Sequence, residues 1–230
     1  MKTFGTRQTA HSAQTHRNTI PDLIKGTVYV VSDNIDTDQI IPAQYLSLDP
    51  SRPEERKKFG WYALSGLPEP SQGLPKGGLP FATEGQPRGR FPLVIAGKNF
   101  GCGSSREHAC IALQEAGVRA VIAEFFARIF YRNSVNGGYL IPCDSPHTRL
   151  CDVIATGMEG ELILTNPTKP VLHVAALKTS WTLGPLGDVL PILEAGDLFT
   201  YARHQGLIRE HSSPSTTHGP QEMPHESAED

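Results

Sequence analysis

The segment Asn99-Phe-Gly-Cys-Gly-Ser-Ser-Arg-Glu-His108 lies between an apolar run and a stretch of helical composition, and it decides how the surrounding chain folds. The apolar run at residues 91–96 is typical of a buried strand, and residues 105–116 are predicted to form a helix. Gly101 and Gly103 allow a tight turn and a close approach of the backbone to a ligand. The segment is therefore predicted to be a glycine-rich turn between a strand and a helix.

The hydroxyl groups of this turn allow two interpretations. Ser104 and Glu107 match the S-x-x-E capping box, in which the serine caps the helix. Alternatively, the free N–H groups and the positive end of the helix, together with Arg106, would hold a carboxylate and stabilise the alkoxide of a serine base. The residues of the turn leave both interpretations open.

Working outward from the turn, strands and helices alternate. This order predicts a parallel, right-handed α/β core, followed by a more β-rich part. The other predicted strands are residues 27–31, 119–123 and 139–142, with a hairpin at 161–165 and 171–175. The other predicted helices are residues 125–135, 189–194 and 197–205.

The chain is divided by composition into a domain and two tails. We expect a flexible extension at residues 1–24, one domain at 25–209 and a disordered acidic tail at 210–230. Residues 49–90 are rich in proline and glycine and are predicted to form a long loop inside the domain. Residues 1–20 hold basic but no acidic side chains, so they are interpreted either as the extension of a cytoplasmic protein or as a plastid transit peptide.

Composition excludes several classes of function. A net charge of -3 gives no basic surface for nucleic acid, and no apolar run approaches the ~20 residues that span a membrane. The four cysteines contain no C-x-x-C motif, so we expect free thiols and no metal bound by this chain. A calcium site at Asp33, Asp36 and Asp38 is disfavoured, because the order of ligands in a calcium-binding loop is missing.

Four motifs resemble one known family, that of aconitase. Residues 99–109 resemble the active-site signature of the aconitase swivel domain, and residues 33–45 look like its N-terminal motif. Residues 125–134 and 197–208 resemble two of its helices, so the match spans nearly all of residues 25–209. It is closest to the separate small subunits of isopropylmalate isomerases, the 3-isopropylmalate dehydratases. The resemblance implies an aconitase-swivel-like β/β/α fold with a partly parallel sheet and flanking helices.

The resemblance also implies an activity and a partner. Family members move a hydroxyl between neighbouring carbons of a small dicarboxylate, here in leucine biosynthesis, by dehydration and rehydration. The resemblance assigns Ser104 as the base, and Ser105, Arg106, Thr37 and Asp38 as residues that bind substrate. It implies a large partner subunit that carries a [4Fe-4S] cluster, without which this chain would be inactive.

Substrate choice is expected to depend on the loop Tyr45-Leu46-Ser47-Leu48, whose leucines Leu46 and Leu48 suit an isopropyl group; Arg52 lies a few residues beyond. A homoaconitase subunit, a methylmalate or citraconate hydro-lyase subunit, and a non-catalytic module of the same fold remain alternatives. A serine hydrolase is disfavoured, because no G-x-S-x-G motif is present. Arg128, Arg132 and Asn133 are open to roles at the site, at the partner interface or on the surface.

Overall fold

The computed structural model describes residues 20–85 and 89–208 of the chain. The segment interpreted as a possible transit peptide, residues 1–20, lies outside these ranges except for its last residue. The predicted acidic tail at residues 210–230 lies entirely outside them. The predicted extension at residues 1–24 is too long at its C-terminal end. Strand β1 (Leu23–Val30) begins inside it, because Leu23 and Ile24 pair with residues of strand β5.

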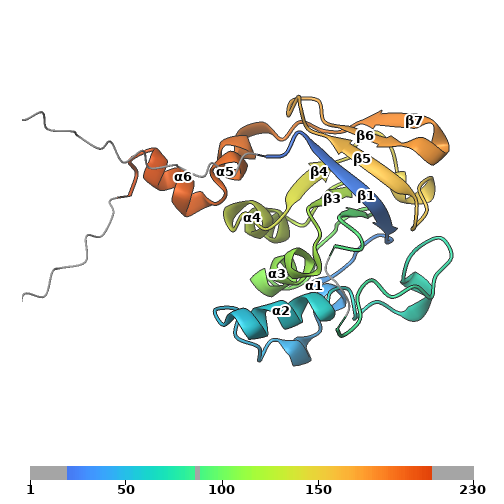
Figure 1. The fold of residues 1–230 in the computed structure, drawn as a ribbon, viewed down its shortest axis with the longest axis horizontal. Coiled ribbons are helices and arrows are strands. Elements are labelled where there is room, and N and C mark those ends of the chain that lie inside the picture. Colours follow the sequence, from blue (N-terminus) through green and yellow to red (C-terminus); the bar gives the residue numbers. More distant parts are fainter. Residues whose placement is uncertain (1–19, 86–88, 209–230) are drawn as a thin grey trace, which may run out of the picture.

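A seven-stranded sheet organises the domain (Figure 1). Strand order is β4-β3-β2-β1-β5-β6-β7, and the first four strands in this order run parallel. Strand β5 pairs with β1, β6 pairs with β5 and β7 pairs with β6, all in antiparallel orientation. The prediction of an α/β fold with a partly parallel sheet is therefore confirmed. The strands other than β1 are β2 (Leu93–Ile95), β3 (Ala120–Ala123), β4 (Ile141–Asp144), β5 (Glu159–Ile163), β6 (Val171–Val174) and β7 (Thr179–Thr182).

Six α-helices and five 3-10 turns are present in the described ranges. None of these helices has the length and apolar composition needed to cross a bilayer. The helices are α1 (Thr37–Ile40), α2 (Pro53–Trp61), α3 (Glu107–Ala116), α4 (Arg128–Asn136), α5 (Leu190–Ala195) and α6 (Leu198–His204). The 3-10 turns are η1 (Ala43–Tyr45), η2 (Glu69–Ser71), η3 (Leu150–Asp152), η4 (Ala175–Leu177) and η5 (Gly187–Val189).

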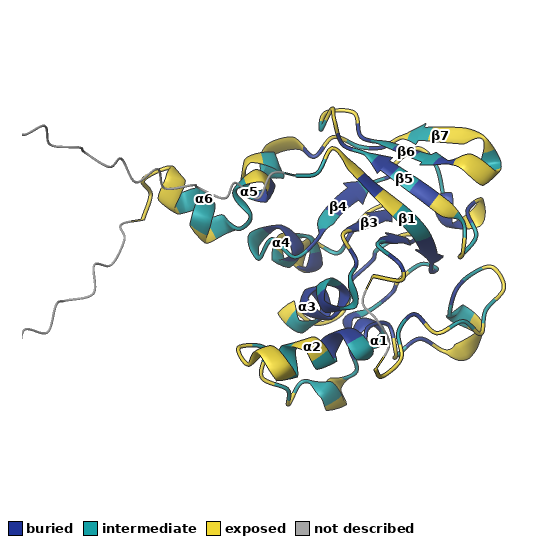
Figure 2. Cartoon of the chain, viewed as in Figure 1, coloured by how far each residue is buried: buried dark blue, intermediate teal, exposed yellow. Residues whose placement is uncertain are grey.

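Two apolar clusters lie on the two faces of the parallel strands. Along β1 the side chains alternate, so that Tyr29 belongs to one cluster and Val28 and Val30 to the other. The first cluster packs against α2 and α3, whereas the second is covered by β5, β6 and α5 (Figure 2). Each fully buried large apolar side chain contributes roughly 1.5–3 kcal/mol. These clusters leave the loops at the carboxyl ends of the parallel strands free to carry a site.

The prediction of a long loop at residues 49–90 is wrong in part, because helix α2 lies within this range. Proline stands at the first position of α2 and glutamates fill its first turn, both of which favour a helix start. Phe59 is fully buried, and a Cβ on Gly60 would lie 2.5 Å from the backbone of Glu115, so α2 packs closely on α3. Arg56 adds an ion pair to Glu115 at 2.9 Å.

Candidate active site

The glycine-rich turn after β2 is held by contacts on both sides. Gly101 has a φ of +78° and Gly103 one of +94°, conformations that side chains rarely adopt. The Gly101 amide donates to the carbonyl of Ile35 at 2.7 Å. A Cβ on Gly101 would lie 2.2 Å from Cγ of Phe130, so the ring of α4 packs directly against the backbone here. Both glycines are therefore required by the path of the chain.

Ser104 follows this turn and is exposed. Its amide donates to Oγ1 of Thr37 at 3.1 Å, and the two hydroxyl oxygens are 3.5 Å apart. Helix α3 begins only at Glu107, with Arg106 as its N-cap and no side-chain cap. The capping-box interpretation of Ser104 is therefore wrong, and Glu107 instead accepts a hydrogen bond from the Tyr139 hydroxyl at 2.6 Å. Because no helix cap engages it, the Ser104 hydroxyl is available to a ligand.

Thr37 is the first residue of helix α1, and the start of this helix holds it in place. Asp36 caps this helix, its carboxylate accepting from the Gln39 amide at 2.7 Å while the Gln39 side chain accepts from the Asp36 amide. The Thr37 amide donates to the Cys102 carbonyl at 2.8 Å, and its side chain is only 1% exposed. The N-terminal motif thus supports the turn, and its buried hydroxyl ends beside Ser104.

Arg106 and Asp38 form an ion pair beside this hydroxyl. The contact uses Nη1 of Arg106, whose side chain is 20% exposed. Its other N–H groups have no partner among the described residues, so the guanidinium can also grip a carboxylate. Ser105 is exposed, and its carbonyl accepts from Nδ2 of Asn133 at 3.5 Å. Four of the five residues predicted to act as base or to bind substrate therefore form two contacting pairs, Ser104 with Thr37 and Arg106 with Asp38.

The predicted specificity loop packs against the neighbouring helix α2. Tyr45 stacks on Tyr62 with ring centroids 3.7 Å apart, and Leu46 and Leu48 are half-buried against the first cluster. Ser47 is exposed. Within the described ranges no hydrogen bond or ring contact joins this loop to residues 104–106. Its role in specificity stays a prediction.

The donor groups of the described residues do not fit a metal or an iron–sulfur cluster. These ranges contain no group of three or more His, Cys, Asp or Glu side chains that could hold an ion. All four cysteines are free, and burial raises the pKa of Cys110 and of Cys143 to about 12, so both stay protonated. The aspartates of the disfavoured calcium site have separate partners, since Asp36 caps α1 and Asp38 pairs with Arg106.

A network of ion pairs around Arg149, the Arg149 clamp, connects loops that follow the parallel strands, and no sequence pattern predicted it. One guanidinium nitrogen of Arg149 lies 2.6 Å from Oδ1 of Asp33, after β1, and 2.7 Å from Oε1 of Glu124, after β3. The same Asp33 oxygen accepts from the Lys98 amide at 2.7 Å, in the loop after β2. Arg149 thus joins three loops at the carboxyl end of the parallel sheet. No local motif marks it, because Asp33 is 116 residues away in sequence.

This clamp predicts a pH-dependent stability. The hydrogen bond from Arg149 holds the pKa of Asp33 below its ordinary value of 3.8. Because the folded value is the lower one, the stabilisation is present above about pH 4 and is lost as the pH falls through the folded pKa. Asp33→Asn is expected to lower the free energy of unfolding at pH 7 and to flatten its decline between pH 5 and pH 3, measured by urea denaturation. A decline as steep as that of the unchanged chain contradicts this, and Asp188→Asn, at an exposed position on η5, is the control.

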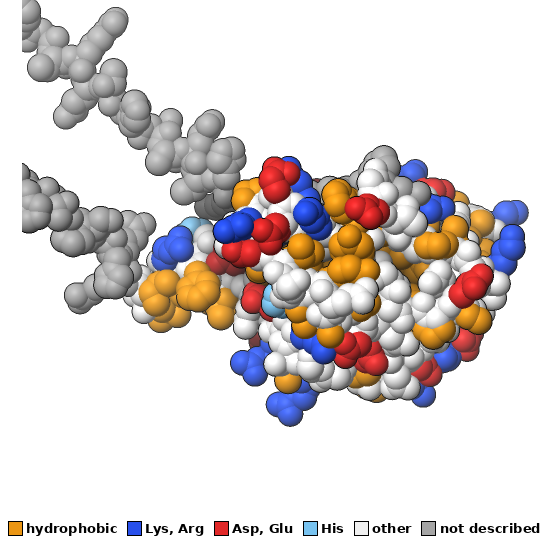
Figure 3. Space-filling view, turned by 90° about the horizontal axis from the view of Figure 1, so that it is seen from below, with side chains coloured by type: hydrophobic (Ala, Val, Ile, Leu, Met, Phe, Trp, Pro, Cys, Tyr) orange, Lys and Arg blue, Asp and Glu red, His pale blue; other side chains and the backbone are white. Residues whose placement is uncertain are grey.

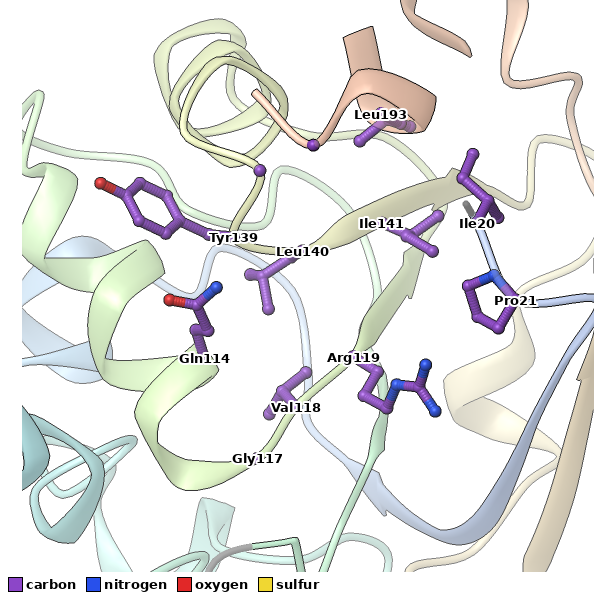
Figure 4. A pocket seen from close by; sticks show the side chains of 12 residues that line it. Ile20, Pro21, Gln114, Gly117, Val118, Arg119, Tyr139, Leu140, Ile141 and Leu193 are labelled. Carbon is purple, nitrogen blue, oxygen red and sulfur yellow. The ribbon is translucent and has the colours of Figure 1, made fainter. Parts of the chain in front are cut away.

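A pocket of about 450 Å³ lies away from this site (Figure 4). Val118, Arg119 and Leu140 line it, next to the amino ends of β3 and β4, whereas the glycine-rich turn follows the carboxyl end of β2. Ile20, Tyr139 and Leu193 close its other sides. None of the predicted site residues lines this pocket.

Comparisons with known proteins identify the family. A family model described as the aconitase C-terminal domain matches residues 81–146, which include the glycine-rich turn and α3. The 3-isopropylmalate dehydratase small subunit 1 of Arabidopsis thaliana is 46% identical over 190 residues, covering 80% of this chain and 70% of the relative. The methanogen homoaconitase small subunit of Methanocaldococcus jannaschii is 34% identical over 190 residues, 81% of this chain and 95% of the relative.

A solved structure gives the same result. The crystal structure of 3-isopropylmalate dehydratase from Methanocaldococcus jannaschii matches with a TM-score of 0.62 and 33% identity, covering 80% of this chain and 96% of that one. The sequence match and the structural match each cover 80% of the chain. The chain belongs to the aconitase family, among the small subunits of 3-isopropylmalate dehydratases.

Proposed function

We propose that this chain is the small subunit of a 3-isopropylmalate dehydratase, a hydro-lyase that interconverts 2-isopropylmalate and 3-isopropylmalate through isopropylmaleate in leucine biosynthesis. The observation that carries the proposal is the placement of Ser104. Its hydroxyl is exposed, lies 3.5 Å from Thr37 Oγ1, and follows a turn that two positive-φ glycines fix. Relatives with this name match four-fifths of the chain.

Ser104 is proposed to act as the base. In the first half of the reaction the Ser104 oxygen takes the proton from the carbon that carries a carboxylate, and hydroxide leaves the neighbouring carbon, so that one water is lost. In the second half, water adds back with the hydroxyl on the other carbon, and Ser104 returns the proton. Positive charge favours the alkoxide, and Arg106, whose guanidinium pairs with Asp38, lies two residues after Ser104 in sequence.

Arg106 and Ser105 are proposed to hold a substrate carboxylate. Asp38 occupies one nitrogen of the guanidinium, and the N–H groups that have no partner among the described residues could bind a carboxylate through both of its oxygens. Holding the substrate this way places its acidic carbon against Ser104. A fixed geometry of this kind accounts for much of the rate in reactions that depend on positioning.

The second reactive group is proposed to come from another chain. A [4Fe-4S] cluster on a large subunit would supply a Lewis acid for the departing hydroxyl. The thiols of this chain are free and mostly buried, and the described residues do not form a ligand set for such a cluster. We therefore expect no turnover by this chain alone.

Isopropylmalate is favoured over homocitrate by the surroundings of the predicted specificity loop. Leu46 and Leu48 present apolar surface, which suits an isopropyl group. Arg52, the nearest arginine in sequence that could serve a third carboxylate, is engaged by Asp49 at 3.6 Å and by Glu55 at 3.3 Å. Both partners lie within three residues of Arg52.

The proposal is tested with the reconstituted complex. The full chain is mixed with the large subunit, and turnover of isopropylmalate, homocitrate and citraconate is compared. We expect isopropylmalate to give the highest kcat/KM, with residual activity on smaller relatives, because an apolar pocket discriminates by only ~1–3 kcal/mol per methylene. Preference for homocitrate would replace this substrate with that of the homoaconitase relative, and no turnover of any diacid would leave the non-catalytic alternative.

A further inference from the structure

An exposed apolar and cationic surface surrounds the first turn of α4. Phe125 is 48% exposed and Ile129 is 47% exposed. Arg128 and Arg132 are exposed as well, and they lie one helical turn apart on α4. We name these four residues the α4 surface. Aromatic side chains and arginine are enriched at protein interfaces, and exposed large apolar side chains that gather together mark contact sites.

The arginines of the α4 surface have no counter-ion within the described chain. Arg128 is the first residue of α4, whose first turn holds no acidic side chain and whose N-cap Ala127 gives no side-chain hydrogen bond. A cation at the positive end of a helix is unfavourable. Among the residues that the structure describes, neither Arg128 nor Arg132 forms an ion pair. The surface is therefore complementary to a partner that brings acidic groups.

Two concave sites flank these arginines and reach the glycine-rich turn. Both guanidinium side chains line a pocket of about 430 Å³ together with Ile129, Gly101 and Gly103. Arg128 and Arg132 also line a second pocket, of about 330 Å³, whose other walls are Phe125, Phe126, Tyr131 and Asp144. The α4 surface is thus continuous with the turn that positions Ser104.

From these observations we infer that the large subunit docks on the α4 surface, with acidic side chains against Arg128 and Arg132 and apolar side chains against Phe125 and Ile129. The inference rests on the proposed function, in which the partner must bring its reactive group close to Ser104. Occupation of the pocket beside Gly101 and Gly103 would satisfy that requirement, because the partner would then contact the turn itself.

A second apolar patch lies elsewhere and does not adjoin the site. Phe199 in α6 is 68% exposed and Leu207 is 71% exposed, and hydrophobic side chains gather at this end of the molecule (Figure 3). Helix α6 follows Gly196, whose carbonyl lies against Gly138 just beyond the C-terminal end of α4. It therefore lies at the opposite end of α4 from Arg128, and it does not line the pocket beside the turn.

The inference is tested by the affinity of the full chain for the large subunit, measured by titration calorimetry. Ile129→Glu is expected to weaken binding at least tenfold, because it places an unpaired charge in an apolar contact. Leu23→Glu is the matched control, since Leu23 is 46% exposed but lies at the start of β1, and it should bind within about twofold of the unchanged chain. Circular dichroism of each free variant checks that its fold is intact.

A second arm separates the partner from the substrate as the occupant. The double variant Arg128→Gln, Arg132→Gln is expected to weaken binding of the large subunit, and by less at high salt. Unchanged affinity of Ile129→Glu overturns the inference, and so does a double variant that binds normally while the KM for isopropylmalate rises. Turnover by the unchanged complex is measured in parallel. If the unchanged complex has no turnover, the proposed function is contradicted. If Ile129→Glu assembles normally, only the docking surface is contradicted.

Discussion

Replacing Ser104 by alanine is expected to lower kcat of the reconstituted complex roughly 10²–10⁴-fold, the contribution typical of a positioned general base. The change removes only the hydroxyl oxygen. The backbone of the turn stays in place, because the amide of residue 104 still donates to Thr37 and the glycines before it are unchanged. Binding of the large subunit and KM for isopropylmalate should therefore change little.

The measurement is steady-state turnover of isopropylmalate by complexes that are first shown to assemble. Ser65→Ala is the control, since Ser65 is an exposed serine in the turn after α2 and belongs to none of the site motifs. A Ser104→Ala complex that keeps more than about a tenth of its kcat would show that the base is another group. Loss of assembly in that variant would point to a structural role for the hydroxyl.

Gly101→Ala is expected to destabilise the domain by about 2–5 kcal/mol, the largest effect on folding foreseen here. A left-handed backbone costs a residue with a Cβ roughly 1–2 kcal/mol, and a side chain forced into a packed contact costs about 1–3 kcal/mol more. Both terms apply, because Gly101 has a φ of +78° and its added Cβ would stand 2.2 Å from the Phe130 ring. This is a large part of the about 5–15 kcal/mol that stabilises most domains.

Gly78→Ala separates the two causes. Gly78 has a φ of +70°, but a Cβ there would meet no atom within 4 Å. Urea denaturation at pH 7 should thus show a loss of about 1–2 kcal/mol for Gly78→Ala and a clearly greater one for Gly101→Ala. Equal losses in both variants would mean that the close contact between Gly101 and Phe130 does not shape this turn.

The features that could be predicted from sequence depend on neighbouring residues. Runs such as residues 91–96 and 120–123 are apolar throughout, as buried parallel strands are, and both contain strands. Gly117 ends α3 with a φ of +97°, as a helix-ending glycine should. The resemblance assigned both Thr37 and Ser104 to the site, and their direct contact across 67 positions of sequence is seen only in the structure.

The features that the sequence did not predict depend on long-range contacts or weak local patterns. Helix α3 begins two residues later than expected, since Ser104 is bonded to Thr37 rather than to the helix. Helix α2 was hidden by the density of proline and glycine after it. Strand β7 is largely exposed at the sheet edge, so its residues show no apolar alternation.

The Arg149 clamp limits how far the glycine-rich segment at residues 99–109 can be treated as an independent unit. Asp33, Lys98 and Glu124 belong to three separate loops, and a single guanidinium on a fourth loop joins two of them directly and the third through Asp33. Grafting residues 99–109 onto a related scaffold would transfer the proposed reacting groups but not the ion pairs that hold the neighbouring loops together. A transplanted motif would therefore need an arginine in the position of Arg149, together with carboxylates in the positions of Asp33 and Glu124, to keep its shape in the new host.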